Sequence, residues 1–146
     1  MIALVKHHEL DTEKWDACIR KDVSGMFYGL SWYLDILVKE WDALVLNDYE
    51  AVFPLVSGKR FGIHYLHRPY GVQQLGVFSV NKLSAEVLAE FMSAIPKKYK
   101  FVDVFLNGLQ IEGKSEIKKI VSAVKGVLPI HNILLHQYLE KVYLSV

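Results

Sequence analysis

The sequence predicts an α/β domain with a mixed, mostly antiparallel sheet and helices on both faces of that sheet. Apolar residues follow strand or helix spacing in the order strand, helix, helix, several strands in hairpin succession, helix, strand, helix, strand. A length of 146 residues and a hydrophobic content of 52% suit one folded unit. We therefore expect residues 1–146 to form a single domain.

The chain begins with a predicted strand and two predicted helices. Residues 2–7 have strand character, and Asp11 is a suitable N-cap for a helix over residues 11–21. One face of this helix is apolar at the spacing i, i+3, i+4, through Trp15, Cys18 and Ile19. A second short helix is expected over residues 31–39.

The middle of the chain predicts a hairpin followed by a turn. Residues 43–46 and 50–56 are typical of strands around a turn at residues 47–48. Pro54 has no N–H to donate, so it should lie at a sheet edge or a bulge. The Ser-Gly-Lys sequence at residues 57–59 predicts the next turn.

A strand over residues 61–66, a loop over 67–71 and an extended run over 72–78 should follow. Ser84 is the expected N-cap of the most amphipathic helix, which Pro96 ends. Its apolar face carries Val87, Leu88, Phe91, Met92 and Ile95. Beyond it we expect a strand, a helix, a strand and a last short helix, over residues 101–106, 117–124, 130–137 and 138–146.

The charge balance and the single cysteine exclude several classes of function. Seventeen basic and sixteen acidic residues give a net charge of +1, so no DNA partner is expected. Cys18 alone cannot form a disulfide framework or a cysteine-based zinc site within one chain. No run approaches the about 20 apolar residues of a membrane helix, and no signal peptide is recognisable. We expect a cytoplasmic protein without a membrane partner.

The histidines and aromatic residues are interpreted as structural. His64 and His67 would lie on opposite faces of one strand, roughly 10 Å apart, so no shared metal is expected. Without a basic stripe beside them, several aromatic residues and one methionine are interpreted as core or helix-packing anchors. The alternative is a stacking platform for bases or a cofactor ring. These residues are Met26, Phe27, Tyr28, Trp32, Tyr33 and Trp41.

Four segments carry a family resemblance: Ser31–Asp35 (SWYLD), Trp41–Val45 (WDALV), Asp48–Leu55 (DYEAVFPL) and Pro69–Ser79 (PYGVQQLGVFS). Together they resemble the first half of bacterial Fem-like proteins, whose halves belong to the GNAT superfamily of acyl-CoA N-acyltransferases. The resemblance covers about residues 1–107 and implies a GNAT-like sheet.

The resemblance also implies a cofactor loop. In GNAT enzymes a Gln/Arg-x-x-Gly-x-Gly/Ala stretch holds the pyrophosphate of acyl-CoA through backbone N–H groups and the next helix N-terminus. It implies acetyl-CoA or another acyl-CoA bound at Gln73, Gln74, Gly76 and Ser79. Residues 73–78 should be extended, lie beside the sheet's centre and lead into a helix within two residues of Ser84. Phe78 replaces a small residue there, and its Cβ and ring would cause strain or a clash if that position needs a positive φ or a close phosphate. Acetyl-CoA is therefore expected to bind weakly or not at all. Alternatively, Gln73 and Gln74 only pair with strand neighbours and Gly76 marks a bulge.

The reaction implied is transfer of an acyl or aminoacyl group to an amine, by positioning and by polarising the carbonyl. Tyr70 and Asn107 would bind the acceptor. Catalytic residues cannot be assigned, and Glu50 and Asp103 are only nominal candidates for the general base. Because no second acyltransferase half follows Val146, the domain is expected to be incomplete alone. The alternatives are a standalone acetyl-CoA-dependent N-acetyltransferase and a non-catalytic interaction domain.

The C-terminal region predicts association. Residues 127–146 are rich in apolar side chains, and only one face of a strand and helix unit can meet its own core. We expect a homodimer, or a second acyltransferase half, to cover the other face. The alternative is that the last helix folds back and completes the core.

Overall fold

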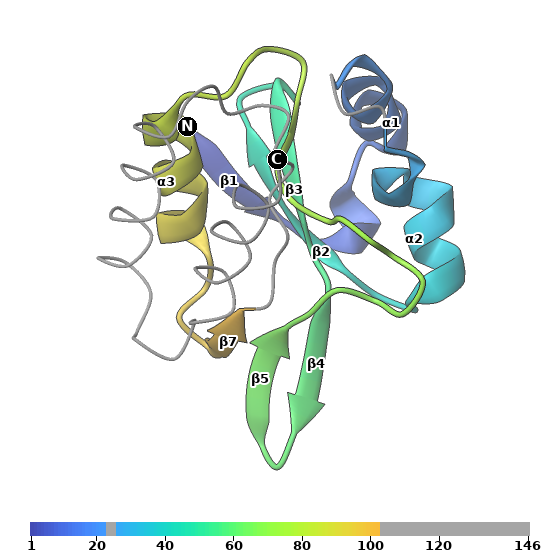
Figure 1. Cartoon of the computed structure of the whole chain (residues 1–146), viewed down its shortest axis with the longest axis vertical. Coiled ribbons are helices and arrows are strands. Elements are labelled where there is room, and N and C mark those ends of the chain that lie inside the picture. Colours follow the sequence, from blue (N-terminus) through green and yellow to red (C-terminus); the bar gives the residue numbers. More distant parts are fainter. Residues whose placement is uncertain (23–25, 103–146) are drawn as a thin grey trace, which may run out of the picture.

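The computed structural model describes residues 1–22 and 26–102, which form a mixed domain of helices and strands (Figure 1). In chain order the elements are β1 (Ile2–Val5), η1 (His7–Glu9), α1 (Thr12–Lys21), η2 (Phe27–Gly29), α2 (Ser31–Leu37), β2 (Asp42–Leu46), β3 (Ala51–Leu55), β4 (Ser57–Arg60), β5 (Ile63–Leu66), β6 (Phe78–Ser79), α3 (Ala85–Ala94) and β7 (Tyr99–Val102). The strands form two sheets within these residues, in the orders β1-β2-β3-β6 and β4-β5-β7, where the sequence predicted one.

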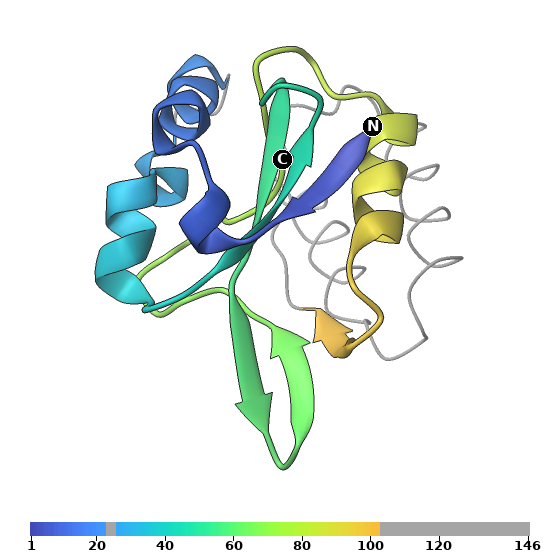
Figure 2. The ribbon, with the colours of Figure 1, turned by 180° about the vertical axis from the view of Figure 1, so that it is seen from behind.

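Helices cover both faces of the four-stranded sheet, as the sequence predicted. α1 and α2 lie on one side of it and α3 on the other (Figures 1 and 2). Successive strand residues point to opposite faces. Leu44 and Phe53 therefore join the core beneath α3, whereas Val45 and Val52 join the core beneath α1 and α2. Two apolar cores stabilise this sheet, one on each face.

The two longest described helices begin at the predicted caps. The Asp11 carboxylate accepts a hydrogen bond from the Lys14 N–H at 3.1 Å, and the Ser84 hydroxyl accepts one from the Val87 N–H at 3.3 Å. α3 begins directly after Ser84 and ends before Pro96, which confirms both predicted signals. The predicted apolar stripe of α1 is also confirmed, because its three residues are buried.

The turn predicted at residues 57–59 is wrong, because these residues belong to β4. The chain turns instead at Phe61-Gly62, whose φ angles are 50° and 77°, and β5 returns antiparallel to β4. A glycine at position 58 predicted a turn, but its role in the structure is to make room for a side chain on the neighbouring strand. A Cβ there would overlap the ring of Tyr65, its partner in the register.

The second sheet also contains a parallel pair. β5 leads through α3 to β7, which lies parallel to β5. Only Val56 separates β3 from β4, so one nearly continuous run of chain contributes to both sheets. Within the described residues, Pro54 pairs with β2 on one side only, which agrees with the expected edge position. On its other side β6 pairs with Ala51 and Val52 and does not reach Pro54.

The segment from Gln73 to Phe78 differs from its prediction. Only its end is regular, because β6 spans Phe78–Ser79 and Leu75 makes an isolated bridge. β6 lies at the edge of the four-stranded sheet and not at its centre. The physical reason is that β4 and β5 leave this sheet, so the later segment takes the edge position beside β3.

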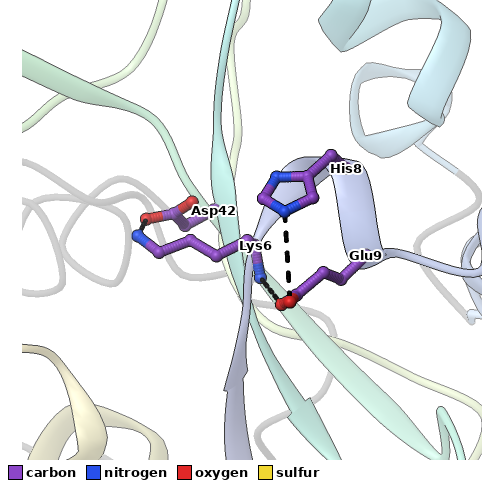
Figure 3. A network of polar contacts seen from close by, with 4 residues as sticks. All are labelled: Lys6, His8, Glu9 and Asp42. Carbon is purple, nitrogen blue, oxygen red and sulfur yellow. Dashed lines mark hydrogen bonds and ion pairs between the residues drawn. The ribbon is translucent and has the colours of Figure 1, made fainter.

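A polar network fastens the N-terminal strand (Figure 3). The Lys6 ammonium lies 2.6 Å from the Asp42 carboxylate, and this hydrogen bond raises the pKa of Lys6 above its ordinary value. The Lys6 N–H also donates to the Glu9 carboxylate at 3.4 Å, and His8 lies 4.0 Å from Glu9. These contacts are exposed, so they orient the end of β1 and contribute little stability.

Several predictions fall outside the described residues. The strand predicted over residues 101–106 is described only to Val102, as part of β7, which begins at Tyr99. The helix and strand predicted beyond it and the association face at residues 127–146 lie outside the described part of the chain, so the homodimer stays a prediction. Within the described part, no helix has the length and apolar character needed to cross a membrane.

Candidate functional site

The loop between β5 and β6 forms the best candidate site. The Val72 N–H donates to the Pro69 carbonyl at 3.2 Å, and Gly71 has a φ of 85°. This is the geometry of a type II turn, in which the third residue requires a positive φ and is usually glycine. Tyr70 occupies the second position and is fully exposed at the tip.

Arg68 and two buried residues hold this loop in place. The Arg68 guanidinium donates a 2.6 Å hydrogen bond to the Gln73 carbonyl and closes the base of the loop. Val72 and Leu75 are buried in the core beneath α1 and α2. The loop is therefore tied down at its base while its tip stays accessible.

An open hollow of about 470 Å³ lies between this loop and η2. Tyr28 of η2 forms one wall, and the loop forms the other through Arg68, Pro69, Tyr70, Gly71, Val72 and Gln73. Arg68 is the only charged side chain among these described lining residues. The hollow thus offers aromatic surface, an amide and one positive charge.

Further aromatic rings extend from Tyr28 along η2 and α2. Tyr28 contacts Phe27 at 4.3 Å between centroids, and Tyr33 meets Phe27 edge-on at 5.1 Å and Trp32 at 5.6 Å. The sequence interpretation of these rings was core or helix-packing anchors. Phe27 and Trp32 are 48% and 52% exposed, so they are not core residues, but both pack on Tyr33 of α2. Trp41 is a core residue, and Met26, Tyr28 and Tyr33 are partly buried. For Phe27 and Trp32, contact with neighbouring rings replaces burial in the core.

The predicted cofactor residues do not share one surface. Gln73 is exposed in the hollow and Gln74 is half-buried, whereas Gly76 and Ser79 are buried. Among the acceptor candidates, Tyr70 joins Gln73 at the hollow, and Asn107 lies outside the described residues. The structure therefore brings Tyr70 and Gln73 together and separates them from Gly76 and Ser79.

The backbone N–H groups after Phe78 have acceptors within the chain. The Ser79 N–H donates to the Asp22 carboxylate at 2.7 Å, and the Val80 N–H donates to the Glu50 carbonyl at 3.0 Å. The Asn81 N–H donates to the Ser79 hydroxyl at 3.3 Å. A pyrophosphate cradle needs N–H groups directed at the ligand. These three donors stabilise the fold instead.

Phe78 is a core residue with a specific partner. It is fully buried, and its φ is not among the positive values. A Cβ on Gly29 would lie 2.6 Å from two carbons of the Phe78 ring, so glycine is required for this contact. The strain that the sequence associated with Phe78 is absent, since the ring points into the core.

The single cysteine and the base candidate Glu50 are held in structural contacts. Burial raises the pKa of the Cys18 thiol from 9.0 to about 11, so this thiol stays protonated at neutral pH. The exposed Glu50 carboxylate accepts a 2.9 Å hydrogen bond from Asn47 in the β2–β3 turn. Asp103 lies outside the described residues. No general base is assigned by this arrangement.

One further cluster links three elements. The Asp35 carboxylate accepts from the Trp41 indole at 2.9 Å and lies 2.9 Å from His7 Nε2. The His7 and Trp41 rings also contact each other at 5.1 Å. These contacts join η1 and α2 to Trp41. Because Trp41 is buried in the core, we interpret the cluster as structural. Across residues 1–22 and 26–102, no group of three or more metal-ligating side chains is found.

The sequence did not group Tyr28 or Arg68 with the residues of this hollow, although Tyr28 belongs to the stacking platform that was the alternative interpretation. Tyr28 precedes the loop by 40 positions, and only the fold brings it near. Arg68 carried a local signal, because it directly precedes the Pro-x-Gly sequence within the predicted loop over residues 67–71. No family model, curated protein or solved structure matches this chain.

Proposed function

We propose that this chain is a GNAT-superfamily N-acyltransferase domain of the Fem-like kind, which binds the amine acceptor and does not by itself bind acyl-CoA. The order of its elements supports the proposal: a strand, two helices, antiparallel strands, and then a helix and a strand. This is the order that the resemblance implies. Acyl-CoA binding at Gln73–Ser79, which the resemblance implies, is not part of this proposal, since the N–H groups that follow Phe78 already have acceptors.

The observation that carries the acceptor role is the hollow at Arg68–Gln73. Its aromatic walls suit the apolar part of a small molecule, and the Arg68 cation favours a carboxylate or phosphate. An amine that also carries an anionic group is therefore the acceptor class that fits. In the transfer, the amine nitrogen forms a bond to the acyl carbon, the bond to the leaving group breaks, and the amine loses a proton. With Cys18 protonated and buried, an acyl intermediate on this thiol is disfavoured.

The acceptor role is tested by NMR titration of the whole chain. The probes are dialanine and its C-terminal amide, which share an amine and differ in the carboxylate. We expect dialanine to shift the resonances of Tyr28, Tyr70 and Gln73, and the amide to shift them less. Arg68→Gln should abolish the difference, whereas Arg68→Lys should retain part of it because the charge remains. Arg60→Gln, the same change on the β4–β5 hairpin, is the matched control.

The two alternatives give different results. Calorimetry that shows micromolar affinity for acetyl-CoA would favour a standalone N-acetyltransferase. Saturation with such a ligand at 100 times its Kd would also raise stability by about 2.7 kcal/mol. If neither dialanine nor acetyl-CoA binds, the non-catalytic interaction domain becomes the better interpretation.

A further inference from the structure

The tip of the β4–β5 hairpin has an exposed aromatic residue in an unfavourable conformation. The hairpin projects away from the helices at one end of the molecule (Figures 1 and 2). Its turn has positive φ at both Phe61 and Gly62, as in a type I′ turn. Asn or Asp followed by Gly is preferred there, because a bulky residue is disfavoured at positive φ. Phe61 is nevertheless 89% exposed, so packing within the described chain does not compensate for this conformation.

The residues beside Phe61 continue an apolar strip along one face of the second sheet. Arg60 and Ile63 are register partners, so their side chains share a face. Tyr65 follows on that face and aligns with Phe101 of β7. Ile63 and Phe101 are 42% and 46% exposed. The strip therefore runs from the hairpin tip across to β7 and is exposed at Ile63 and Phe101, whereas Tyr65 between them is half-buried.

The same region is positively charged. The sequence from residue 51 to residue 85 contains no Asp or Glu and carries Lys59, Arg60, Arg68 and Lys82. The other thirteen basic residues share the rest of the chain with all sixteen acidic ones. At the tip, the Arg60 guanidinium lies 5.2 Å from the Phe61 ring centroid. The net charge of the whole chain is small, but the charges are unevenly distributed and the hairpin is cationic. The hairpin is therefore complementary to an anionic surface.

We propose that the β4–β5 hairpin attaches this protein to an anionic lipid surface. Phe61 and Ile63 enter the interfacial layer, while Lys59 and Arg60 contact the lipid phosphates. A projecting convex tip suits a deformable lipid surface, whereas a folded protein partner would need a pocket shaped for Phe61. Aromatic and basic side chains are the usual anchors at this interface. Attachment of this kind needs no spanning helix, and it differs from the sequence expectation that membranes are not partners, which the vesicle experiment below tests.

The test is co-sedimentation of the whole chain with vesicles at 0.1 M salt. One set of vesicles is phosphatidylcholine alone, and the other contains 30% phosphatidylglycerol. We expect binding to the anionic set only, with a loss at 0.5 M salt through screening. Lys59→Gln with Arg60→Gln should weaken binding by about tenfold or more, since each cation near such a surface contributes roughly fivefold. Lys21→Gln with Lys39→Gln is the matched charge control and should bind as the parent does.

Phe61→Asn separates attachment from folding. Asn tolerates positive φ, so this variant should unfold at the same temperature as the parent or higher, yet lose vesicle binding. Ile36→Asn removes an exposed apolar side chain of α2 and should leave binding unchanged. The proposal is overturned if both vesicle sets bind equally, or if Phe61→Asn binds anionic vesicles normally. Binding to the soluble polyanion heparin that survives Phe61→Asn, without vesicle binding, would instead show a site for a soluble anionic partner.

Discussion

Substitution of Gly29 tests whether Phe78 belongs to the core. Gly29 ends η2 and lies against α1, where its carbonyl accepts a 2.8 Å hydrogen bond from the Trp15 indole. An alanine Cβ at this position would lie 2.6 Å from Cε2 and Cζ of Phe78 and 3.0 Å from Cδ1 of Ile19. All three neighbours are buried, so none can turn into solvent. Gly29→Ala should therefore destabilise the fold.

The magnitude follows from two opposing effects. Forcing a methyl group into a packed core costs about 1–3 kcal/mol. Alanine also loses less backbone entropy than glycine on folding, which returns about 0.4–1 kcal/mol where φ is negative. The φ of Gly29 is not positive, so this gain applies. The expected net loss in the free energy of unfolding is about 1–2 kcal/mol, or roughly 3–8 °C in Tm for a domain of this size.

Urea unfolding followed by tryptophan fluorescence measures this loss. With a typical m of about 1–3 kcal/mol/M, the midpoint should fall by roughly 0.5–1 M. Phe78→Leu supplies the matched test, because it removes the ring atoms that the new methyl group would meet. Gly29→Ala should cost less in the Phe78→Leu background than in the parent. A loss below about 0.5 kcal/mol in the parent, or equal losses in both backgrounds, would refute the placement of Phe78.

Two further predictions concern buried polar groups. Asp22→Ala should cost about 1–3 kcal/mol by leaving the buried Ser79 N–H without this acceptor, whereas Asp22→Asn keeps an acceptor oxygen and should cost less, as urea midpoints will show. Cys18 binds its proton more tightly in the folded state, with a pKa near 11 against 9.0, so stability should fall as pH rises through this window. In Cys18→Ala the urea midpoint should decline less between pH 8 and pH 10.5, and an equal decline would contradict the buried thiol.

The candidate site shows how far local reasoning reaches. Tyr70 and Gln73 belong to a segment rich in Pro, Gly and Gln, whose turn and exposure follow from its composition. Ser79 belongs to the same segment, but its burial depends on Asp22, more than fifty residues earlier. The sequence grouped Ser79 with the glutamines by motif alone. The hydrogen bonds of Ser79 could not be predicted from the sequence, because they depend on the tertiary structure.

The sequence by itself determined the elements whose signals are local. Asp11 and Ser84 are caps because their side chains reach N–H groups three residues on, and strand alternation in β2 and β3 follows from backbone geometry. The requirement for glycine at positions 29 and 58 is visible only in the tertiary structure. Each allows close approach by an aromatic ring, Phe78 or Tyr65, from another part of the chain.

The division of the strands into two sheets has the same origin. Strand pairing is chosen by contacts between segments far apart in sequence, and a local pattern records only that a segment is extended. β5 therefore looked like a neighbour of β3, although it pairs with β4 and β7. The exposure of Phe61 could not be predicted either, because the same local sequence is compatible with a buried strand residue and with the tip of a hairpin. The position of the turn decides between them: residues 57–60 pair with β5, with the Tyr65 ring against Gly58, and the chain turns at Phe61 and Gly62.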